Sequence, residues 1–137
     1  MARPTFPLIA RWTEDDEVQE EAVPDVASAL DLYRRIDAAS RKSDPTMVEF
    51  DSSPGPSIAV GAGRDVTVIT AQDSDDPPYF TTMARRQLTP QDLMFMYAGE
   101  NTPYPAHSMV PKADGVRALE RFLRSGELDP DLEWEQL

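Results

Sequence analysis

Residues 24–51 read PDVASALDLYRRIDAASRKSDPTMVEFD, and within this stretch the spacing of apolar residues changes from a helical to a strand pattern. The first part places apolar residues three or four positions apart, on one face of a helix: Val26, Ala29, Leu30, Tyr33 and Ile36. Residues 47–51 instead alternate between apolar and acidic side chains, which is typical of a half-buried strand. We therefore predict a helix over residues 24–41, followed by a strand.

Short strand patterns separated by turn residues continue the chain. They cover Ser57–Gly61, Asp65–Ala71 and Tyr79–Ala84. Leu93–Ala98 is apolar on both faces, so we expect it to be a central strand. Pro103 and Pro105 lack the N–H groups that a central strand needs. Residues 103–108 are therefore expected to form an edge strand or an extended loop.

A second amphipathic helix is predicted over residues 112–125, because its apolar residues share one face: Val116, Leu119, Phe122 and Leu123. Near the start of the chain, Thr5–Trp12 is expected to be an edge or irregular strand, since Pro4 and Pro7 lie beside and within it. This order predicts an α+β fold, in which an antiparallel β-meander sheet carries two amphipathic helices packed mainly on one face. At this length we expect a single domain, residues 1–137.

The chain is strongly acidic, with 25 Asp and Glu residues against 13 Lys and Arg and a formal net charge of −12. Direct nucleic-acid binding requires a basic surface, so this charge argues against it, and against docking on an anionic membrane. The longest apolar run is too short to span a bilayer, and no secretory signal is apparent. The chain has no cysteine, which is compatible with a reducing cytoplasm.

The acidic residues gather in three segments. We expect a solvated loop at about residues 13–23, a second acidic loop at residues 73–78 and an acidic tail at residues 127–137. Carboxylates of the two loops are candidate contacts for a basic partner: Glu14, Asp15, Asp16, Glu17, Glu20, Glu21, Asp73, Asp75 and Asp76. Solubility alone is the alternative explanation of their charge. Aromatic residues beside turns or prolines are candidate binding anchors: Trp12, Tyr79, Phe80 and Tyr104.

No catalytic or metal-binding constellation is recognisable. His107 is the only histidine, and its neighbour Ser108 would point to the opposite face of an extended strand. Asp73, Asp75 and Asp76 lack the glycine and the distal glutamate of an EF-hand calcium loop. We therefore expect no cofactor and no metal. An enzyme that relies on carboxylates alone is the weakest of the interpretations.

The last third of the chain resembles the C-terminal signature of the Imm1 family of bacterial immunity proteins. That signature is a short amphipathic helix with a late Phe, a glycine cap and a Trp-Glu pair near the terminus. The matching residues are Phe122, Gly126, Trp134 and Glu135. The resemblance extends over most of residues 27–135, and its specific part is the last thirty or so residues.

The resemblance implies a cytoplasmic, non-enzymatic inhibitor that belongs to a polymorphic toxin system and binds its cognate toxin domain. In this family the toxins are often nucleic-acid deaminases, which hold a base in a pocket beside a zinc-bound water. Such a toxin must present a basic surface to its substrate, and an acidic inhibitor would complement that surface. The alternative interpretation is an acidic adaptor or chaperone for a basic export substrate.

Overall fold

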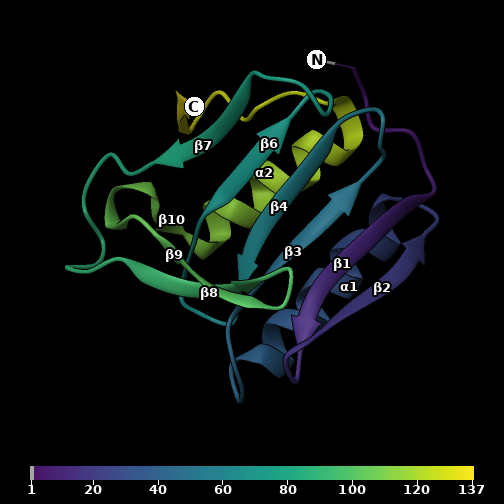
Figure 1. Cartoon of the computed structure of the whole chain (residues 1–137). Helices are drawn as coiled ribbons and strands as arrows, with labels where there is room; N and C mark the ends of the chain where they lie inside the picture. Colours follow the sequence, from purple (N-terminus) through teal and green to yellow (C-terminus); the bar gives the residue numbers. More distant parts are fainter. Residues whose placement is uncertain (1) are drawn as a thin grey trace.

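The computed structural model describes residues 2–137 and contains two helices and eleven strands (Figure 1). The helices are α1 (Val26–Ser40) and α2 (Lys112–Ser125). The strands are β1 (Leu8–Glu14), β2 (Glu17–Val23), β3 (Thr46–Asp51), β4 (Ser57–Ala62), β5 (Val66–Thr67), β6 (Ile69–Gln72), β7 (Tyr79–Met83), β8 (Leu93–Tyr97), β9 (Glu100–Tyr104), β10 (Val110–Pro111) and β11 (Glu133–Gln136). A short 3-10 helix, η1 (Ala106–Ser108), precedes β10. The predicted α+β class is confirmed.

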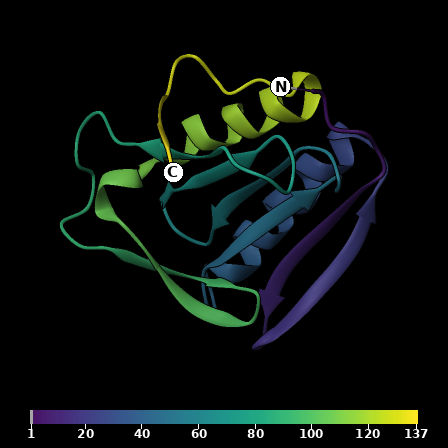
Figure 2. The ribbon, with the colours of Figure 1, turned by 45° about the horizontal axis from the view of Figure 1, so that its top comes forward.

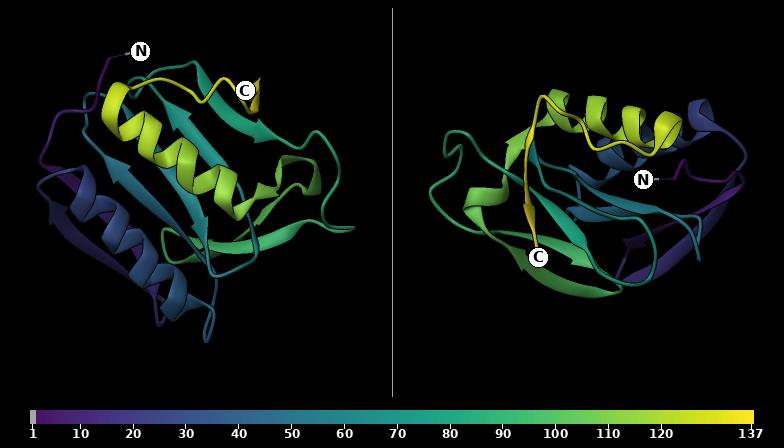
Figure 3. Two further views of the ribbon diagram at one scale, coloured as in Figure 1. Left: turned by 180° about the vertical axis from the view of Figure 1, so that it is seen from behind. Right: turned by 90° about the horizontal axis from the view of Figure 1, so that it is seen from above.

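The main sheet has the strand order β11-β7-β6-β4-β3-β1-β2, and every pair along this path is antiparallel. Both helices lie on one face of the sheet, as Figures 2 and 3 show from two further directions. This arrangement of the helices was predicted. Neither helix in residues 2–137 has the length and apolar character that crossing a membrane requires.

The two helices begin and end where local chemistry favours it. At the start of α1, a carboxylate oxygen of Asp25 accepts a hydrogen bond of 2.8 Å from the Ser28 N–H. At the end of α2, Gly126 adopts the left-handed conformation (φ 76°) and its N–H donates to the Phe122 carbonyl. The main core lies between helices and sheet, and its largest buried side chains are Tyr33, Phe50, Ile58, Leu119 and Phe122.

Strand β8 is not the central strand that its apolar composition predicted. It pairs along its whole length only with β9, and it meets β3 at a single parallel bridge between Thr46 and Met96. The β8–β9 hairpin instead covers part of the sheet face opposite the helices. Phe95 is fully buried there in a second core cluster with Met47, Ala59, Val68 and Met109. Met96 is also buried and Leu93 packs against the same cluster, so the apolar residues of β8 are accounted for by packing against this face of the sheet.

The N-terminal region also differs from the prediction. Strand β1 is an inner strand between β3 and β2, because Pro4 and Pro7 both precede its first residue. The acidic segment at residues 13–23 is a β-hairpin and not a loop. Asp15 and Asp16 have φ values of 52° and 63°, which match the two central residues of the type I′ turn that joins tightly paired strands. Acidic side chains suit β2 because it is an edge strand, where charge opposes pairing with other chains.

The C-terminal tail is ordered by one further strand. Strand β11 pairs with β7, and Trp134 packs against the main core, with its Nε1–H donating to the Asp129 carbonyl at 2.9 Å. Asp129 is itself buried, which opposes its charged form. The Asp131 N–H and the Arg117 guanidinium, at 2.9 Å each, outweigh that burial and lower the pKa of the Asp129 carboxyl.

Candidate partner-binding surface

The two acidic segments considered for a partner lie at opposite ends of the sheet. The β1–β2 turn at Asp15 and Asp16 closes one end. Because β3 runs antiparallel to β1 and the strands alternate from there, the β3–β4 and β6–β7 turns both close the other end (Figure 1). The acidic loop at residues 73–78 belongs to this second end, where Ser53 donates to Asp75 at 3.3 Å. One continuous acidic patch therefore cannot include both segments.

A second turn packs against the β1–β2 turn. Ala98 and Gly99, between β8 and β9, also have positive φ values, 52° and 82°, and thus form another tight hairpin turn. The Gly99 N–H donates to the Thr13 hydroxyl oxygen at 3.1 Å. Figure 2 shows the two hairpin tips side by side. The contact holds the acidic hairpin in a fixed position relative to β8 and β9.

A hollow of about 100 Å³ opens beside these paired turns. Its lining residues are Arg11, Trp12, Thr13, Val18, Met47, Glu49, Tyr97 and Ala98. Two of them, Val18 (48% exposed) and Tyr97 (43% exposed), are among the three large apolar side chains exposed in residues 2–137. We call this region the tip hollow. It places exposed apolar surface within the acidic end of the sheet.

Three carboxylates surround Arg11, which lines the tip hollow together with one of them, Glu49. The guanidinium lies 2.8 Å from Glu20, 3.3 Å from Glu49 and 2.9 Å from Asp51. These hydrogen bonds, led by the one that Arg11 donates to Glu20, raise the pKa of Arg11. With one cation against three anions, the group carries two uncompensated negative charges.

Tyr97 is connected to the same carboxylates. Its hydroxyl donates to Glu49 at 3.3 Å. Partial burial, followed by the nearby Glu49 carboxylate, raises the pKa of the Tyr97 phenol, because both disfavour a second negative charge. The phenol is thus neutral near pH 7, and its ring forms one wall of the hollow.

The candidate carboxylates differ in whether they have a hydrogen-bond or ion-pair partner within the protein. Glu20 pairs with Arg11, and Glu21 lies 3.7 Å from Arg35. Asp73 accepts a hydrogen bond of 3.1 Å from the Ala2 N–H. The hairpin tip carries four carboxylates: Glu14, Asp15, Asp16 and Glu17. Within residues 2–137, none of these side chains forms an ion pair or a side-chain hydrogen bond. The tip carboxylates therefore project their charge without an internal partner.

The aromatic residues expected to be exposed are all partly buried. Trp12 packs on the main core and Tyr104 on the second cluster, where Tyr104 meets Phe95 edge to face at 5.8 Å. Burial raises the pKa of Tyr104 to about 12. Tyr79 donates to the Asp75 carbonyl at 2.7 Å, and Phe80 pairs in register with the core residue Ala71. Sequence reasoning missed Tyr97, which it assigned to the core with the rest of β8.

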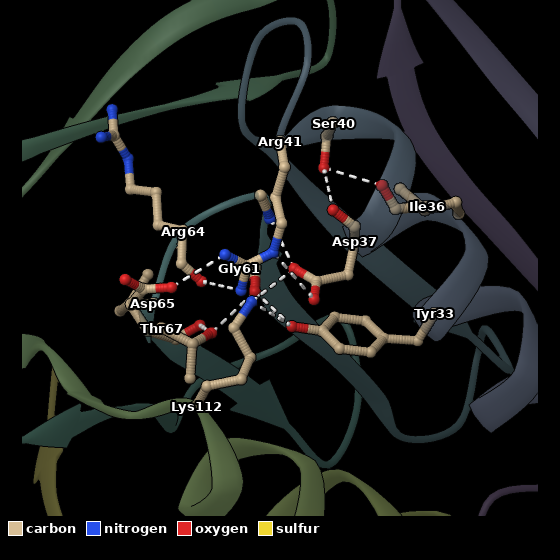
Figure 4. A network of polar contacts seen from close by, with 12 residues as sticks. Tyr33, Ile36, Asp37, Ser40, Arg41, Gly61, Arg64, Asp65, Thr67 and Lys112 are labelled. Atoms are coloured by element: carbon tan, nitrogen blue, oxygen red, sulfur yellow. Dashed lines mark hydrogen bonds and ion pairs between the residues drawn. The ribbon is translucent and has the colours of Figure 1, made fainter.

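A largely enclosed cluster of charged groups joins the two helices (Figure 4). Lys112 lies 2.6 Å from Asp37, and its Nζ also contacts the Tyr33 hydroxyl at 3.2 Å. Asp37 also accepts from the Gly63 N–H at 2.7 Å, and the Arg41 guanidinium lies 3.7 Å away. Burial lowers the pKa of Lys112, although Asp37 opposes this effect. Each polar atom here is engaged by the fold, so the cluster serves as a link between α1, α2 and the end of β4.

The two residues considered for catalysis lie in different environments. His107 is exposed, and its Nε2 lies 3.6 Å from Glu135. Ser108 is buried. Within residues 2–137, no group of three or more His, Cys, Asp or Glu side chains is placed to hold a metal ion.

Comparison with known proteins identifies the family. The family model described as immunity protein Imm1 matches residues 14–136, nearly the whole chain. This chain belongs to the Imm1 family. A search of curated proteins found no match. Members of such a family bind toxins, so membership gives this protein the role of an immunity protein against a toxin.

Most of the residues on which the resemblance to Imm1 rests contribute to the packing of the fold. Phe122 is buried in the main core, and Gly126 provides the left-handed end of α2. Trp134 ties the C-terminal strand to the core, whereas Glu135 lies on the other face of that strand beside His107. Three of these four residues therefore contribute to how α2 and the C-terminal tail pack.

Proposed function

We propose that this Imm1 protein neutralises a toxin that acts on nucleic acid, with a nucleic-acid deaminase as the leading class, and that it does so in the cytoplasm as a non-enzymatic inhibitor. The single observation that supports a nucleic-acid target is charge: an Imm1 chain with a formal net charge of −12 suits a toxin with a basic substrate groove. Electrostatic attraction between the two would raise the association rate about 10- to 1,000-fold at low salt.

The acidic hairpin tip is the part of this protein best suited to meet that groove. Its carboxylates have no internal partners, it projects from the end of the sheet, and the contact between Gly99 and Thr13 holds it in place. A rigid binding surface loses little conformational entropy on association, which favours a tight complex. The loop at residues 73–78 is the second candidate surface.

The test uses the catalytically inactive C-terminal domain of the toxin encoded by the neighbouring reading frame. We expect a folded one-to-one complex, and we expect the active toxin domain to stop modifying DNA or RNA when this protein is added. A neighbouring toxin that binds but acts on another class of substrate would refute the nucleic-acid target. Binding only to an unfolded toxin chain would instead favour the adaptor or chaperone role.

A further inference from the structure

The tip hollow combines features that the fold itself does not require. Strand β2 is an edge strand, and its charged side chains are explained by protection of that edge. Val18 has the opposite character, because it exposes an apolar side chain on the same strand. Tyr97 approaches it from a hairpin far away in the sequence, and the two residues line one depression.

The hollow is also formed in advance of any binding event. Gly99 is bonded to Thr13 across the two turns, and Val18 Cγ2 lies 3.9 Å from the place where a Cβ on Gly99 would be. The hydrogen bonds from Arg11 hold Glu49, which lines the hollow, and the neighbouring Glu20 and Asp51 in position. A side chain entering the hollow would therefore meet positioned groups and would not need to order them.

The residues that line the tip hollow favour one kind of side chain as its occupant. A long basic side chain has an apolar stem, which would pack against Val18 and the Tyr97 ring, and a cationic head, which the carboxylates would accept. Glu20 and Glu49 remain partly exposed beside Arg11, so they retain acceptor capacity. A purely apolar occupant would bury two uncompensated negative charges, which is costly. A second copy of this chain would bring two such acidic groups together.

We propose that the tip hollow receives a basic side chain, Arg or Lys, from the cognate toxin domain, and that this contact sets the dissociation rate of the complex. The proposal rests on the proposed function and locates its main contact. Arg is enriched among residues that dominate binding energy, and its guanidinium matches carboxylates in a two-point geometry. Toxins that grip nucleic acid carry such residues in the groove that an inhibitor must block.

The experiment measures dissociation from the immobilised, inactive toxin domain of the neighbouring reading frame. We expect Tyr97→Ala to raise the dissociation rate constant about tenfold or more. Tyr97→Phe, which keeps the ring, should change it less than about threefold. Leu137→Ala is the matched control, because Leu137 is the third large apolar side chain exposed in residues 2–137 and does not line the tip hollow. It should leave the dissociation rate unchanged.

A second variant keeps the proposal testable if Tyr97→Ala does not fold. Val18 is exposed on an edge strand, so Val18→Arg should fold, and its new cation should occupy the hollow and repel the incoming one. We expect it also to raise the dissociation rate about tenfold or more. If both Tyr97→Ala and Val18→Arg dissociate like the wild type, the hollow is not the main contact. If the wild type does not bind the toxin domain, the proposed function itself fails.

The chemical identity of the occupant has its own readout. The photo-reactive residue p-benzoylphenylalanine, introduced at position 97, should cross-link to a toxin peptide that contains Arg or Lys at the cross-linked site. Replacement of that basic residue in the toxin by Ala should then raise the dissociation rate as much as Tyr97→Ala does. Cross-linking to a site without a nearby basic residue would overturn the proposal.

Discussion

Lys112 on α2 and Asp37 on α1 form an ion pair of 2.6 Å, and this pair joins the two helices on the sheet. Both side chains are largely enclosed, with 17% and 18% of their surfaces exposed. Asp37 also accepts from the Gly63 N–H, and Tyr33 reaches from the same helix to the Gly61 carbonyl. The network therefore couples the helical layer to the end of β4, on the face opposite the tip hollow.

Breaking this pair should destabilise the fold. We expect Lys112→Met to lower the free energy of unfolding by about 2 kcal/mol, because it leaves the enclosed Asp37 carboxylate with only the more distant Arg41, at 3.7 Å, as its cation. In a double-mutant cycle with Asp37→Asn, which keeps an acceptor for the Gly63 N–H, the coupling should be about 1–2 kcal/mol. Urea denaturation measures all four proteins. The exposed pair Asp31–Arg35 is the control, with an expected coupling below about 0.5 kcal/mol.

A glycine inside α2 gives a prediction that opposes helix propensity. A Cβ on Gly115 would lie 2.2 Å from Thr67 Cγ2, so the helix can approach β5 only because residue 115 has no side chain. We expect Gly115→Ala to lower the free energy of unfolding by about 1–3 kcal/mol, although Ala favours helix formation by about 1 kcal/mol. Thermal denaturation would measure this.

The same contact supplies the control. Thr67→Ser removes the obstructing methyl group and keeps the hydroxyl that donates to the Gly61 carbonyl at 2.8 Å. In the Thr67→Ser background, Gly115→Ala should lose most of its cost and become neutral or stabilising. Equal destabilisation in both backgrounds would show that steric contact with Thr67 is not the cause.

Helices were predictable here, because their signals are local. The three-and-four spacing around Tyr33 needs no knowledge of the rest of the fold, and Gly126 marks the end of α2 by its conformational freedom alone. The placement of β8 was not predictable in this way. A strand that is apolar on both faces must be covered on both, but the sequence does not say whether strands or loops provide the cover.

The binding surface was harder still. Exposure of Tyr97 depends on where β8 leaves the sheet, and that point is set by long-range contacts such as the bridge between Thr46 and Met96. The alternation of β2 was obscured because both of its faces carry carboxylates. A solvated loop and an acidic edge strand therefore have similar sequence patterns. The pairing of Asp15 and Asp16 was the available signal, since adjacent Asp residues tolerate the positive φ of a hairpin turn.

Asp129 should make stability depend on acidic pH. Its pKa in the folded protein lies below the ordinary 3.8, so its carboxylate stabilises the fold above that pH. The stabilisation is lost as the pH falls through the folded-state pKa. At neutral pH, Asp129→Asn should lower the free energy of unfolding by about 2 kcal/mol, because Arg117 loses a charged acceptor. The difference from wild type should shrink below about pH 4 in urea denaturation. A constant difference at all pH values would contradict this.

Trp134 should anchor the C-terminal strand. Truncation of a large aromatic side chain packed on the core typically costs about 3 kcal/mol, and we expect Trp134→Ala to cost about that amount. Trp134→Phe keeps most of the packing and loses the hydrogen bond to the Asp129 carbonyl, so its cost should be about 1 kcal/mol. Thermal denaturation would compare the two. An unchanged melting temperature in the alanine variant would place the indole in a binding role instead.

The acidic hairpin tip should control how fast the toxin domain associates. The first variant replaces Glu14, Asp15, Asp16 and Glu17 by Gln or Asn. Asn tolerates positive φ well, so the turn at positions 15 and 16 should keep its shape. We expect slower association in stopped-flow measurements at low salt, and a smaller difference from wild type at about 1 M salt, where charges are screened beyond about 3 Å. The dissociation rate should change less, because unpaired charges at the rim of an interface act mainly on the association rate.

The loop at the other end of the sheet provides the comparison. Neutralisation of Asp73, Asp75 and Asp76 changes the net charge by a similar amount at a distant site. If it slows association as much as the tip variant does, total charge matters and its position does not. If it alone slows association, the toxin approaches the opposite end of the sheet, where Tyr79 and Phe80 lie. If neither variant is slower at low salt, the acidity of this protein serves solubility, and attraction to a basic groove plays no part in toxin binding.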